Sequence, residues 1–346
     1  MTLTVRARPG RSATEILAET RKVFEPAYRS AVTALPADIA TVGGYHIGWW
    51  DAQRTPTQLG GKSIRPALVL ASAAANTRGS AELTRERAII AAVAVEMVHD
   101  FSLLHDDIMD NDEIRRHRCA AWATFGVPAA ILTGDLFLTA ATNLLISQDR
   151  DAARILIKAL HALCEGQTED LAFENRPSVS LPECLHMVEG KTAALLSASC
   201  ELGAWAAHAG PEKATLMRQF GLQLGFAFQL VDDLLGIWGD PEITGKPVFA
   251  DLVHRKKSLP VVAALNSHTT AGIELAQRYS GTDLLSQAEL EDLARLIELA
   301  GGRRWAEDAA AEHISAAQHL LEQAEPNPAA AADLLTLAGL ITRRER

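Results

Sequence analysis

The sequence has few cysteines, and their spacing excludes a disulfide framework or a structural zinc site. Cys119, Cys164, Cys184 and Cys200 form no CxxC pair and no Cys/His cluster with zinc-site spacing. A chain of 346 residues also needs no disulfides to stabilise its core. We therefore expect four reduced, buried thiols in a cytoplasmic protein.

Long hydrophobic runs are lacking as well. The apolar stretch 88–95 ends at Glu96, and the stretch 129–146 is interrupted by Gly134-Asp135. Neither reaches the roughly 18 uninterrupted apolar residues of a membrane span. The basic N-terminus leads into no apolar segment of the kind that secretory signals contain. We expect a soluble chain without a transmembrane segment.

Basic residues are outnumbered, because 33 Lys and Arg stand against 43 Asp and Glu, a net charge of −10. This balance argues against nucleic acid or an anionic membrane surface as the main partner. An anionic substrate is still compatible with it, if local basic clusters or bound cations meet that substrate. Glycine and proline, at 23 and 14 residues, are too scarce for a collagen-like or low-complexity chain.

Helical periodicity, in contrast, runs through almost the whole chain. Apolar residues recur at helical spacing over 84–110, and Ser180 and Ser286 stand where helix starts are expected. Alternating β-branched runs are missing. We predict an all-α fold in which residues 1–12 are disordered and residues 13–346 form a single large helical domain. Two loops are expected, at 43–61, which contains Trp49-Trp50, and at 239–247.

The chemistry is concentrated in the stretch HDFSLLHDDIMDNDEIRRHR, residues 99–118. On a helix, Asp106 and Asp110 lie one turn apart on the same face, and Asp107 lies beside them. Their like charges repel one another at the end of an apolar helix, and a basic run that begins at Arg115 follows. Carboxylates that collect a hard cation beside arginines that bind anions suit a metal-bridged phosphate site.

A second acidic pair, Asp232-Asp233, also ends an apolar helix, where an unpaired buried charge is expensive. Two such sites on different helices can face each other across a cavity and hold several Mg²⁺ ions. Gly60-Gly61-Lys62 precedes a helix but lacks the spacing of a Walker A loop. Gly190 lies in a helical pattern before Lys191-Thr192, where glycine is costly and indicates a close approach.

Together these motifs resemble the trans-isoprenyl diphosphate synthases, most closely the bacterial geranylgeranyl diphosphate synthases. GGKxxRP, HDxSLLHDDxxDxxxxRR, GKT, FQxxDD and GKP followed by DL and KK occur in this order over residues 43–265. The resemblance implies a homodimer of all-α subunits of the isoprenoid synthase type, each built around a deep central cavity. It also implies a Mg²⁺-dependent prenyltransferase that condenses isopentenyl diphosphate with an allylic diphosphate to give geranylgeranyl diphosphate.

The resemblance further implies roles for single residues. Mg²⁺, in three ions, would be bound by Asp106, Asp107, Asp110, Asp232 and Asp233. The allylic diphosphate would be held by Arg115, Lys191, Thr192, Gln229, Lys246 and Lys256. Isopentenyl diphosphate would be held by Lys62, Arg65, His99 and Arg116. The residues acting directly on the departing diphosphate would be Asp106, Asp107, Asp110, Arg115, Lys191, Asp232 and Lys246.

One position departs from the family pattern. The second motif usually reads DDxxD, but Gly236 stands at the third acid, and Asp240 one turn further lies where the helix should end. Because Asp232 can supply the principal ligand, we expect metal binding to survive with an altered affinity.

In the implied reaction, Mg²⁺ together with Arg and Lys side chains stabilises the departing diphosphate and leaves an allylic cation. The alkene of isopentenyl diphosphate attacks this cation, the released diphosphate takes the proton, and an apolar cavity keeps water out. Phe101 and Ser102 would lie about one turn below Asp106, under the growing chain. By family analogy a bulky Phe101 beside a small Ser102 permits growth to the geranylgeranyl length; alternatively, Phe101 is only a core residue.

Two other functions stay open. A class I terpene cyclase would need the metal-binding acids but not the isopentenyl diphosphate residues Lys62, Arg65, His99 and Arg116, which are all present. A non-catalytic partner subunit of an active synthase is favoured by Gly236 and disfavoured by the intact first motif.

Overall fold

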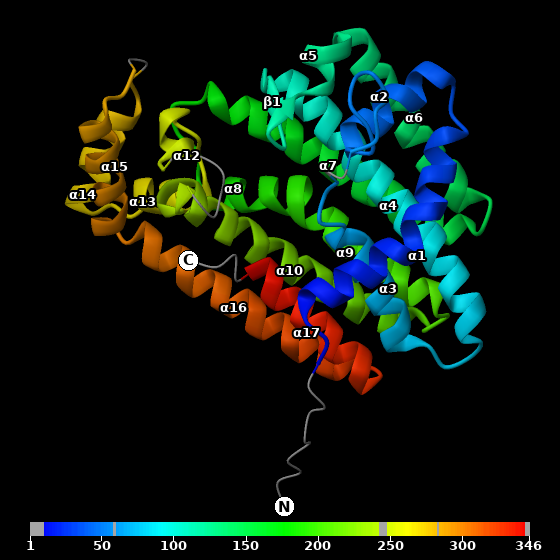
Figure 1. The fold of residues 1–346 in the computed structure, drawn as a ribbon. Helices are drawn as coiled ribbons and strands as arrows, with labels where there is room; N and C mark the ends of the chain where they lie inside the picture. Colours follow the sequence, from blue (N-terminus) through cyan, green and yellow to red (C-terminus); the bar gives the residue numbers. More distant parts are fainter. Residues whose placement is uncertain (1–9, 58–59, 242–247, 282–283, 343–346) are drawn as a thin grey trace, which may run out of the picture. The chain divides into compact units, whose positions relative to one another are not determined.

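The computed structural model describes residues 10–57, 60–241, 248–281 and 284–342, and there the chain is almost entirely helical (Figure 1). The predicted all-α class is confirmed. Within these residues the chain divides into two compact units, unit 1 over 10–158, 198–217 and 326–337, and unit 2 over 159–197, 218–325 and 338–342. The single domain over 13–346 stays a prediction. Four helices contribute residues to both units: α7 (Arg150–Glu174), α9 (Ala194–Ala206), α10 (Pro211–Trp238) and α17 (Pro328–Thr342).

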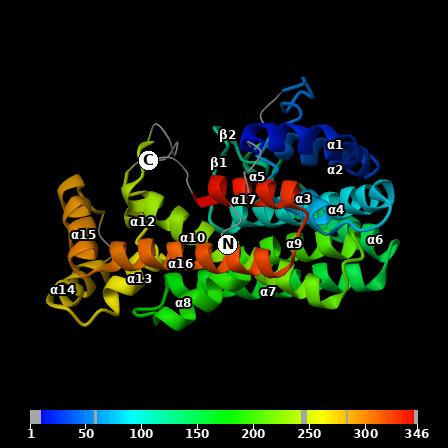
Figure 2. The same cartoon turned by 90° about the horizontal axis from the view of Figure 1, so that it is seen from below.

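In unit 1, α4 is the central helix, with α3 and α6 packed along it and α1 and α2 lying over these three (Figure 2). The Ser80 hydroxyl caps α4 by accepting the Leu83 N–H at 3.3 Å, and no glycine or proline interrupts the helix. Fully buried alanines such as Ala91 and Ala94 let its neighbours approach closely. The helices that lie wholly in this unit are α1 (Ala13–Thr33), α2 (Ala37–Ile47), α3 (Ile64–Asn76), α4 (Ala81–Met109), α5 (Ala121–Phe125) and α6 (Val127–Ile146).

A short antiparallel hairpin follows α4, formed by β1 (Ile114–Arg115) and β2 (Arg118–Cys119). Its two turn residues, Arg116 and His117, have φ angles of 51° and 63°. Positive φ at both central positions matches the right-handed twist of a two-residue hairpin, but this conformation normally selects Asn or Gly. The hairpin was not predicted, because neither alternating β-branched residues nor a turn dipeptide marks it in the sequence.

The expected loop at 43–61 is wrong in its first part, because α2 continues to Ile47. Glycine serves helix packing there, since a Cβ on Gly44 would lie 1.9 Å from the Trp50 ring. The loop begins at Gly48, whose φ of 98° ends the helix in the left-handed region. Trp50 is buried, and its indole N–H donates to the Thr41 carbonyl at 2.9 Å.

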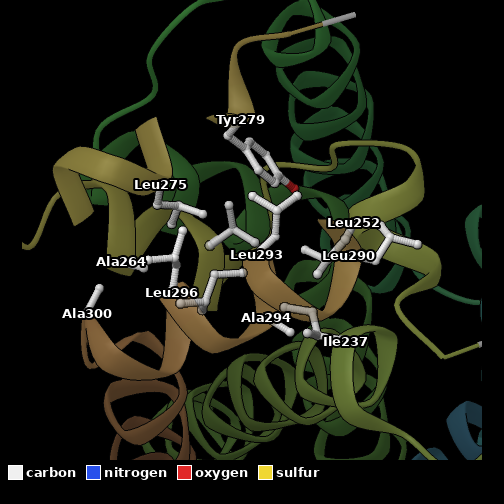
Figure 3. Packing of buried hydrophobic residues seen from close by; sticks show 12 residues of the cluster. Ile237, Leu252, Ala264, Leu275, Tyr279, Leu290, Leu293, Ala294, Leu296 and Ala300 are labelled. Carbon is white, nitrogen blue, oxygen red and sulfur yellow. The ribbon is translucent and has the colours of Figure 1, made fainter. Parts of the chain in front are cut away.

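Unit 2 is arranged around α13, which packs against α8, α14, α15 and α16. Figure 3 shows one of its cores, where Leu275 and Leu293 meet from different helices. The predicted helix starts are confirmed, because Ser180 and Ser286 each form a capping box with a glutamate three residues later. The elements that lie wholly in this unit are α8 (Leu181–Val188), the π-helix η1 (Glu189–Ala193), α12 (Ala250–Val253), α13 (Leu259–Leu265), α14 (Thr270–Tyr279), α15 (Gln287–Leu299) and α16 (Gly302–Gln323).

The segment 1–12, expected to be disordered, lies outside the described residues up to residue 9. Ser12 caps α1 through a capping box with Glu15, and Arg11 forms an ion pair with Asp333 in the same unit. All four cysteines are free, as expected. The expectation that all are buried is wrong for Cys119 and Cys164, because the first lies on the unforeseen hairpin and the second on an exposed position of α7.

By length and composition alone, α4, α6 and α10 are apolar enough to cross a membrane. None of these helices contains an uninterrupted apolar run of membrane-spanning length, but windows with up to two charged residues also reach this hydropathy. In α4, 72% of the most apolar window is buried inside the protein, compared with 33% in α6. The absence of a transmembrane segment therefore stays a prediction.

Candidate active site

The first aspartate motif lies at the C-terminal end of α4. The Asp110 N–H donates to the Asp106 carbonyl at 2.8 Å, so the helical turn that places both acids on one face is formed. Asp107 is buried, and its Oδ1 accepts a hydrogen bond from Arg115 Nε at 2.7 Å and another from the same guanidinium's Nη2. A residue expected to bind metal and one expected to bind diphosphate are thus held together by the hairpin.

This donor set fits Mg²⁺ only when a substrate completes the coordination. Among the residues that the structure describes, no group of three or more His, Cys, Asp or Glu side chains forms a metal site. Mg²⁺ usually keeps several waters and takes one or two carboxylates together with substrate phosphates, so a complete protein cage is not required. Asp107 Oδ2 is buried and has no hydrogen-bond partner in the described part of the chain. The motif therefore offers carboxylate oxygens of the kind that a hard cation uses.

Arg116, in the turn of the hairpin, borders a cavity of about 480 Å³. Its Nη2 lies 3.9 Å from Asp100 Oδ1, and a Cβ on Gly61 would lie 2.9 Å from the same Nη2. The glycine in GGKxxRP thus permits the close approach of this guanidinium. The cavity is lined by three arginines, three acids and aromatic side chains, among them Arg21, Arg29, Arg116, Glu25, Glu96, Asp100, Tyr28, Trp49 and Trp50.

A buried polar network supports this cavity. Asp100 is 2% exposed, accepts a hydrogen bond from the Tyr28 hydroxyl, and lies 3.4 Å from His46 Nε2. Desolvation and the neighbouring Arg65 lower the pKa of His99 well below its usual value, so this imidazole is neutral near pH 7. Sequence reasoning missed Asp100, because an acid next to His99 in an apolar helix has no spacing signal of its own.

Glu96→Gln is expected to flatten the pH dependence of the unfolding free energy between about pH 6.5 and 8. Burial and Asp100 raise the pKa of Glu96 to about 8, so the native chain keeps a proton that the unfolded chain, with an ordinary pKa of 4.5, has released. Stability therefore falls as the pH rises towards 8, by up to about 1.4 kcal/mol per pH unit, and glutamine removes this loss. Denaturant unfolding over this pH range measures the effect, and parallel pH profiles for the two proteins would contradict it.

In unit 2, a chain of hydrogen bonds joins three predicted site residues. The Thr192 hydroxyl donates to Gln229 Oε1 at 2.7 Å, and Gln229 Nε2 donates to Asp233 Oδ1 at 2.7 Å. Asp233 Oδ2 accepts the Leu259 N–H at 2.8 Å, and burial raises the pKa of this carboxyl to about 7. Because both its oxygens are engaged within the protein, Asp233 fits a positioning role better than metal binding, which leaves Asp232 as the stronger ligand candidate.

The GKT motif lies in the π-helix η1, a rare element that is frequent at functional sites. The close approach expected at Gly190 is made by α7, since a Cβ at 190 would lie 2.5 Å from the Ala162 carbonyl oxygen. Gly166 of α7 is equally tight, at 2.3 Å from the Lys191 backbone nitrogen. This contact places the Lys191 ammonium against Asp170 of α7, with which it forms an ion pair. Sequence reasoning had no signal for Asp170.

Lys256 is surrounded by carboxylates. Burial alone would lower the pKa of its ammonium, but Asp233, Asp251, Asp170 and Asp232 outweigh burial and raise the pKa above its usual value. Lys256 therefore stays charged beside the second motif.

Not every predicted residue joins these groups. Lys62 is exposed, and Lys246 lies outside the described residues. Unit 1 brings together Asp107 with Arg115 and Arg116 with Asp100, whereas unit 2 brings together Lys191 with Asp170 and Thr192 with Gln229 and Asp233. The expectation that the two aspartate motifs share one cavity stays a prediction.

Comparison with known proteins supports the motif assignment. A model of the polyprenyl synthetase family matches residues 51–297. The geranylgeranyl diphosphate synthase of Mycobacterium tuberculosis (strain ATCC 25618 / H37Rv) is 42% identical over 336 residues, which is 95% of this chain and 93% of the relative. A (2E,6E)-farnesyl diphosphate synthase of Mycobacterium bovis is 42% identical over 346 residues, 98% of this chain and 95% of the relative.

Solved structures agree with this assignment. The polyprenyl synthetase of Streptomyces coelicolor A3(2) has a TM-score of 0.89 at 41% identity, with 95% of this chain and 99% of that one covered. A geranylgeranyl pyrophosphate synthase of Corynebacterium glutamicum, complexed with isoprenyl diphosphate and magnesium, has a TM-score of 0.77 at 25% identity, with 96% and 99% covered. The family expected from the motifs is confirmed: the chain belongs to the polyprenyl synthetases.

Proposed function

We propose that this polyprenyl synthetase condenses isopentenyl diphosphate with an allylic diphosphate in a Mg²⁺-dependent reaction that yields all-trans geranylgeranyl diphosphate. The observation that carries the proposal is the cavity at Arg116, which is lined by three arginines together with acids that include Asp100 and Glu96. A synthase needs a second diphosphate pocket in addition to its metal-binding acids. A terpene cyclase, which ionises a single diphosphate, has no use for one.

The acidic side chains would bind Mg²⁺, and the basic side chains would bind the diphosphates. Mg²⁺, when bound, neutralises the allylic diphosphate and makes it a better leaving group. Arg115 is held at the first motif by Asp107, and Lys191 is held by Asp170, so each would supply positive charge to a diphosphate bound beside it. Three Mg²⁺ ions, as the resemblance implies, would be held by Asp106, Asp107, Asp110 and Asp232, with Asp233 positioning the second motif.

Isopentenyl diphosphate would be bound by the charged guanidinium groups of Arg65 and Arg116. His99, which is neutral because of its lowered pKa, would add a hydrogen bond and no charge. The polar network then holds these groups in place while the alkene attacks the cation. The released diphosphate accepts the proton, so no side-chain base is needed.

The geranylgeranyl length rests on Phe101. Its ring is 7% exposed, stacks edge-on against His105 with centroids 4.7 Å apart, and lies next to Gly134 of α6. Ser102 beside it is small, and its hydroxyl donates to the His99 carbonyl at 2.8 Å. Since the relatives are named for both farnesyl and geranylgeranyl products, the preference for the longer one is part of the proposal.

We further propose a cytoplasmic homodimer without a transmembrane segment, in which α6 forms the contact between subunits. This helix exposes four large apolar side chains, Val127, Ile131, Leu132 and Ile146. One side of α6 already packs against α4 within the chain. We therefore assign its exposed apolar side chains to contact with a second copy of the chain. Light scattering should give twice the mass of the chain, and a monomer, or partition into vesicles, would contradict the assignment.

One assay tests the activity and separates the alternatives. Purified protein is incubated with isopentenyl diphosphate, an allylic diphosphate and Mg²⁺, and the products are sized. Elongated diphosphates support the proposal. A hydrocarbon or alcohol formed without isopentenyl diphosphate would identify a terpene cyclase, and activity that appears only with an added synthase would identify a partner subunit.

A further inference from the structure

Gly236, which replaces the third acid of the second aspartate motif, packs directly against the carboxylate of Asp251. A Cβ built on Gly236 would lie 2.3 Å from Asp251 Oδ2, 2.5 Å from Cγ and 2.8 Å from Oδ1. Real Cβ atoms essentially never come this close to another heavy atom. The carboxylate of Asp251 thus occupies the space into which a side chain at position 236 would project.

The backbone holds Asp251 at this place. The Phe249 N–H donates to the carbonyl of Ile237, the residue after Gly236, at 3.3 Å, which ties the start of α12 to the end of α10. Leu252 is fully buried in the core that Figure 3 shows, to which Ile237 also belongs. On the other side, the Lys256 N–H donates to the Asp251 carbonyl at 2.9 Å. The position of Asp251 against Gly236 is therefore built into the fold of unit 2.

Asp251 also lies within electrostatic range of the second motif. The carboxylates of Asp233, Asp251 and Asp232 all act on the buried ammonium of Lys256. Asp251 and Asp233 are also close enough for their like charges to repel each other. Such a grouping of acids is unfavourable unless cations lie among them, and the ammonium of Lys256 is one cation in this group.

We propose that Asp251 supplies the third carboxylate of the second aspartate motif, in the space that Gly236 leaves free for it. The motif is thus complete in space, although its third acid comes from α12 and not from α10. The inference rests on the proposed function, because the carboxylate would serve Mg²⁺ together with Asp232 while a diphosphate is bound. In this proposal the absence of a side chain at Gly236 is what allows the Asp251 carboxylate to reach the site.

Asp240 is the other acid near the motif in sequence, and it serves as the matched control. It lies beyond the end of α10 and is exposed. The experiment compares wild type with Asp251→Asn, Asp240→Asn, Asp251→Ala and the exchange variant Gly236→Asp/Asp251→Ala. Each protein is titrated with Mg²⁺ in the presence of inorganic diphosphate, with the unfolding temperature as one readout and prenyl transfer as the second.

Asp251→Asn should raise the Mg²⁺ concentration for half-maximal stabilisation, and that for half-maximal rate, about 10- to 100-fold. Asp240→Asn should leave both unchanged. The exchange variant should restore the Mg²⁺ dependence that Asp251→Ala loses, because it returns a carboxylate to the same space from the other helix.

Unchanged Mg²⁺ midpoints in Asp251→Asn would overturn the proposal. The same holds for an exchange variant that is no better than Asp251→Ala. If Asp251 only neutralises Lys256, its loss should change the unfolding temperature without Mg²⁺ and leave the midpoints in place, which also overturns the proposal. Failure of the proposed function would be recognised separately, because wild type would then form no elongated diphosphate. The Mg²⁺ titration of the unfolding temperature would still test the role of Asp251 in that case.

Discussion

Asp106→Ala should lower kcat for chain elongation by about a thousandfold or more while the fold persists. The side chain lies on the last turn of α4 and is half-buried, so its removal opens little space in the core. It takes away a carboxylate from the face that Asp106 shares with Asp110, where the metal-bridged diphosphate would be held. Product formation at saturating Mg²⁺ measures the effect, and circular dichroism checks the fold.

Asp151→Ala is the matched control for this variant. Asp151 is also an aspartate near a helix end in unit 1, but its side chain is 74% exposed and pairs with Arg154 on the surface. Its loss changes the net charge by the same amount and should leave kcat within about twofold, as for an ordinary surface substitution. Near-normal turnover in Asp106→Ala would refute the metal-binding role of the first motif.

Phe101→Ala should shift the products from geranylgeranyl diphosphate to longer chains. Phe101 lies five residues before Asp106 on α4, about one turn deeper, and removal of its ring would extend the space under the growing chain. Chromatography of the dephosphorylated products measures chain length. The variant should also lose roughly 3–5 kcal/mol of stability, because a buried phenyl ring is replaced by a methyl group.

Phe137→Ala separates the two effects. Phe137 is fully buried in the same unit, and its ring lies against Gly43 of α2. It should cost similar stability and leave the product length unchanged. If Phe101→Ala and wild type gave the same product distribution, Phe101 would be an ordinary core residue.

The parts of the molecule that sequence predicted well are those with strong local signals. The helix that became α4 has an unbroken apolar pattern, and Ser180 and Ser286 begin capping boxes, so their helices follow from short-range chemistry. The first motif combines helical spacing with nearby arginines, and its pairing of Asp107 with Arg115 is a local consequence of the chain reversing after α4.

Other features depend on contacts between distant segments, which periodicity does not report. Asp170 meets Lys191 only because Gly166 and Gly190 let two helices touch at the backbone. Gly44 was assigned to a loop because glycine favours loops, whereas its purpose is to accommodate Trp50. Gly236 departs from the family motif in sequence, and the motif alone does not show that the carboxylate of Asp251, fifteen residues later, occupies the space beside it.

The continuity of α4 has a consequence for how such a protein changes in evolution. This one rigid rod carries His99, Phe101 and Asp106, so their separations along the axis are set by a rise of about 1.5 Å per residue. Under the role proposed for Phe101, a substitution there would change the space under the growing chain and leave the other two residues where they are. A one-residue insertion would rotate the acids by about 100° away from their face. Under this proposal, a point mutation at Phe101 can change product length, whereas an insertion or deletion between these residues would displace the acids and is expected to be selected against.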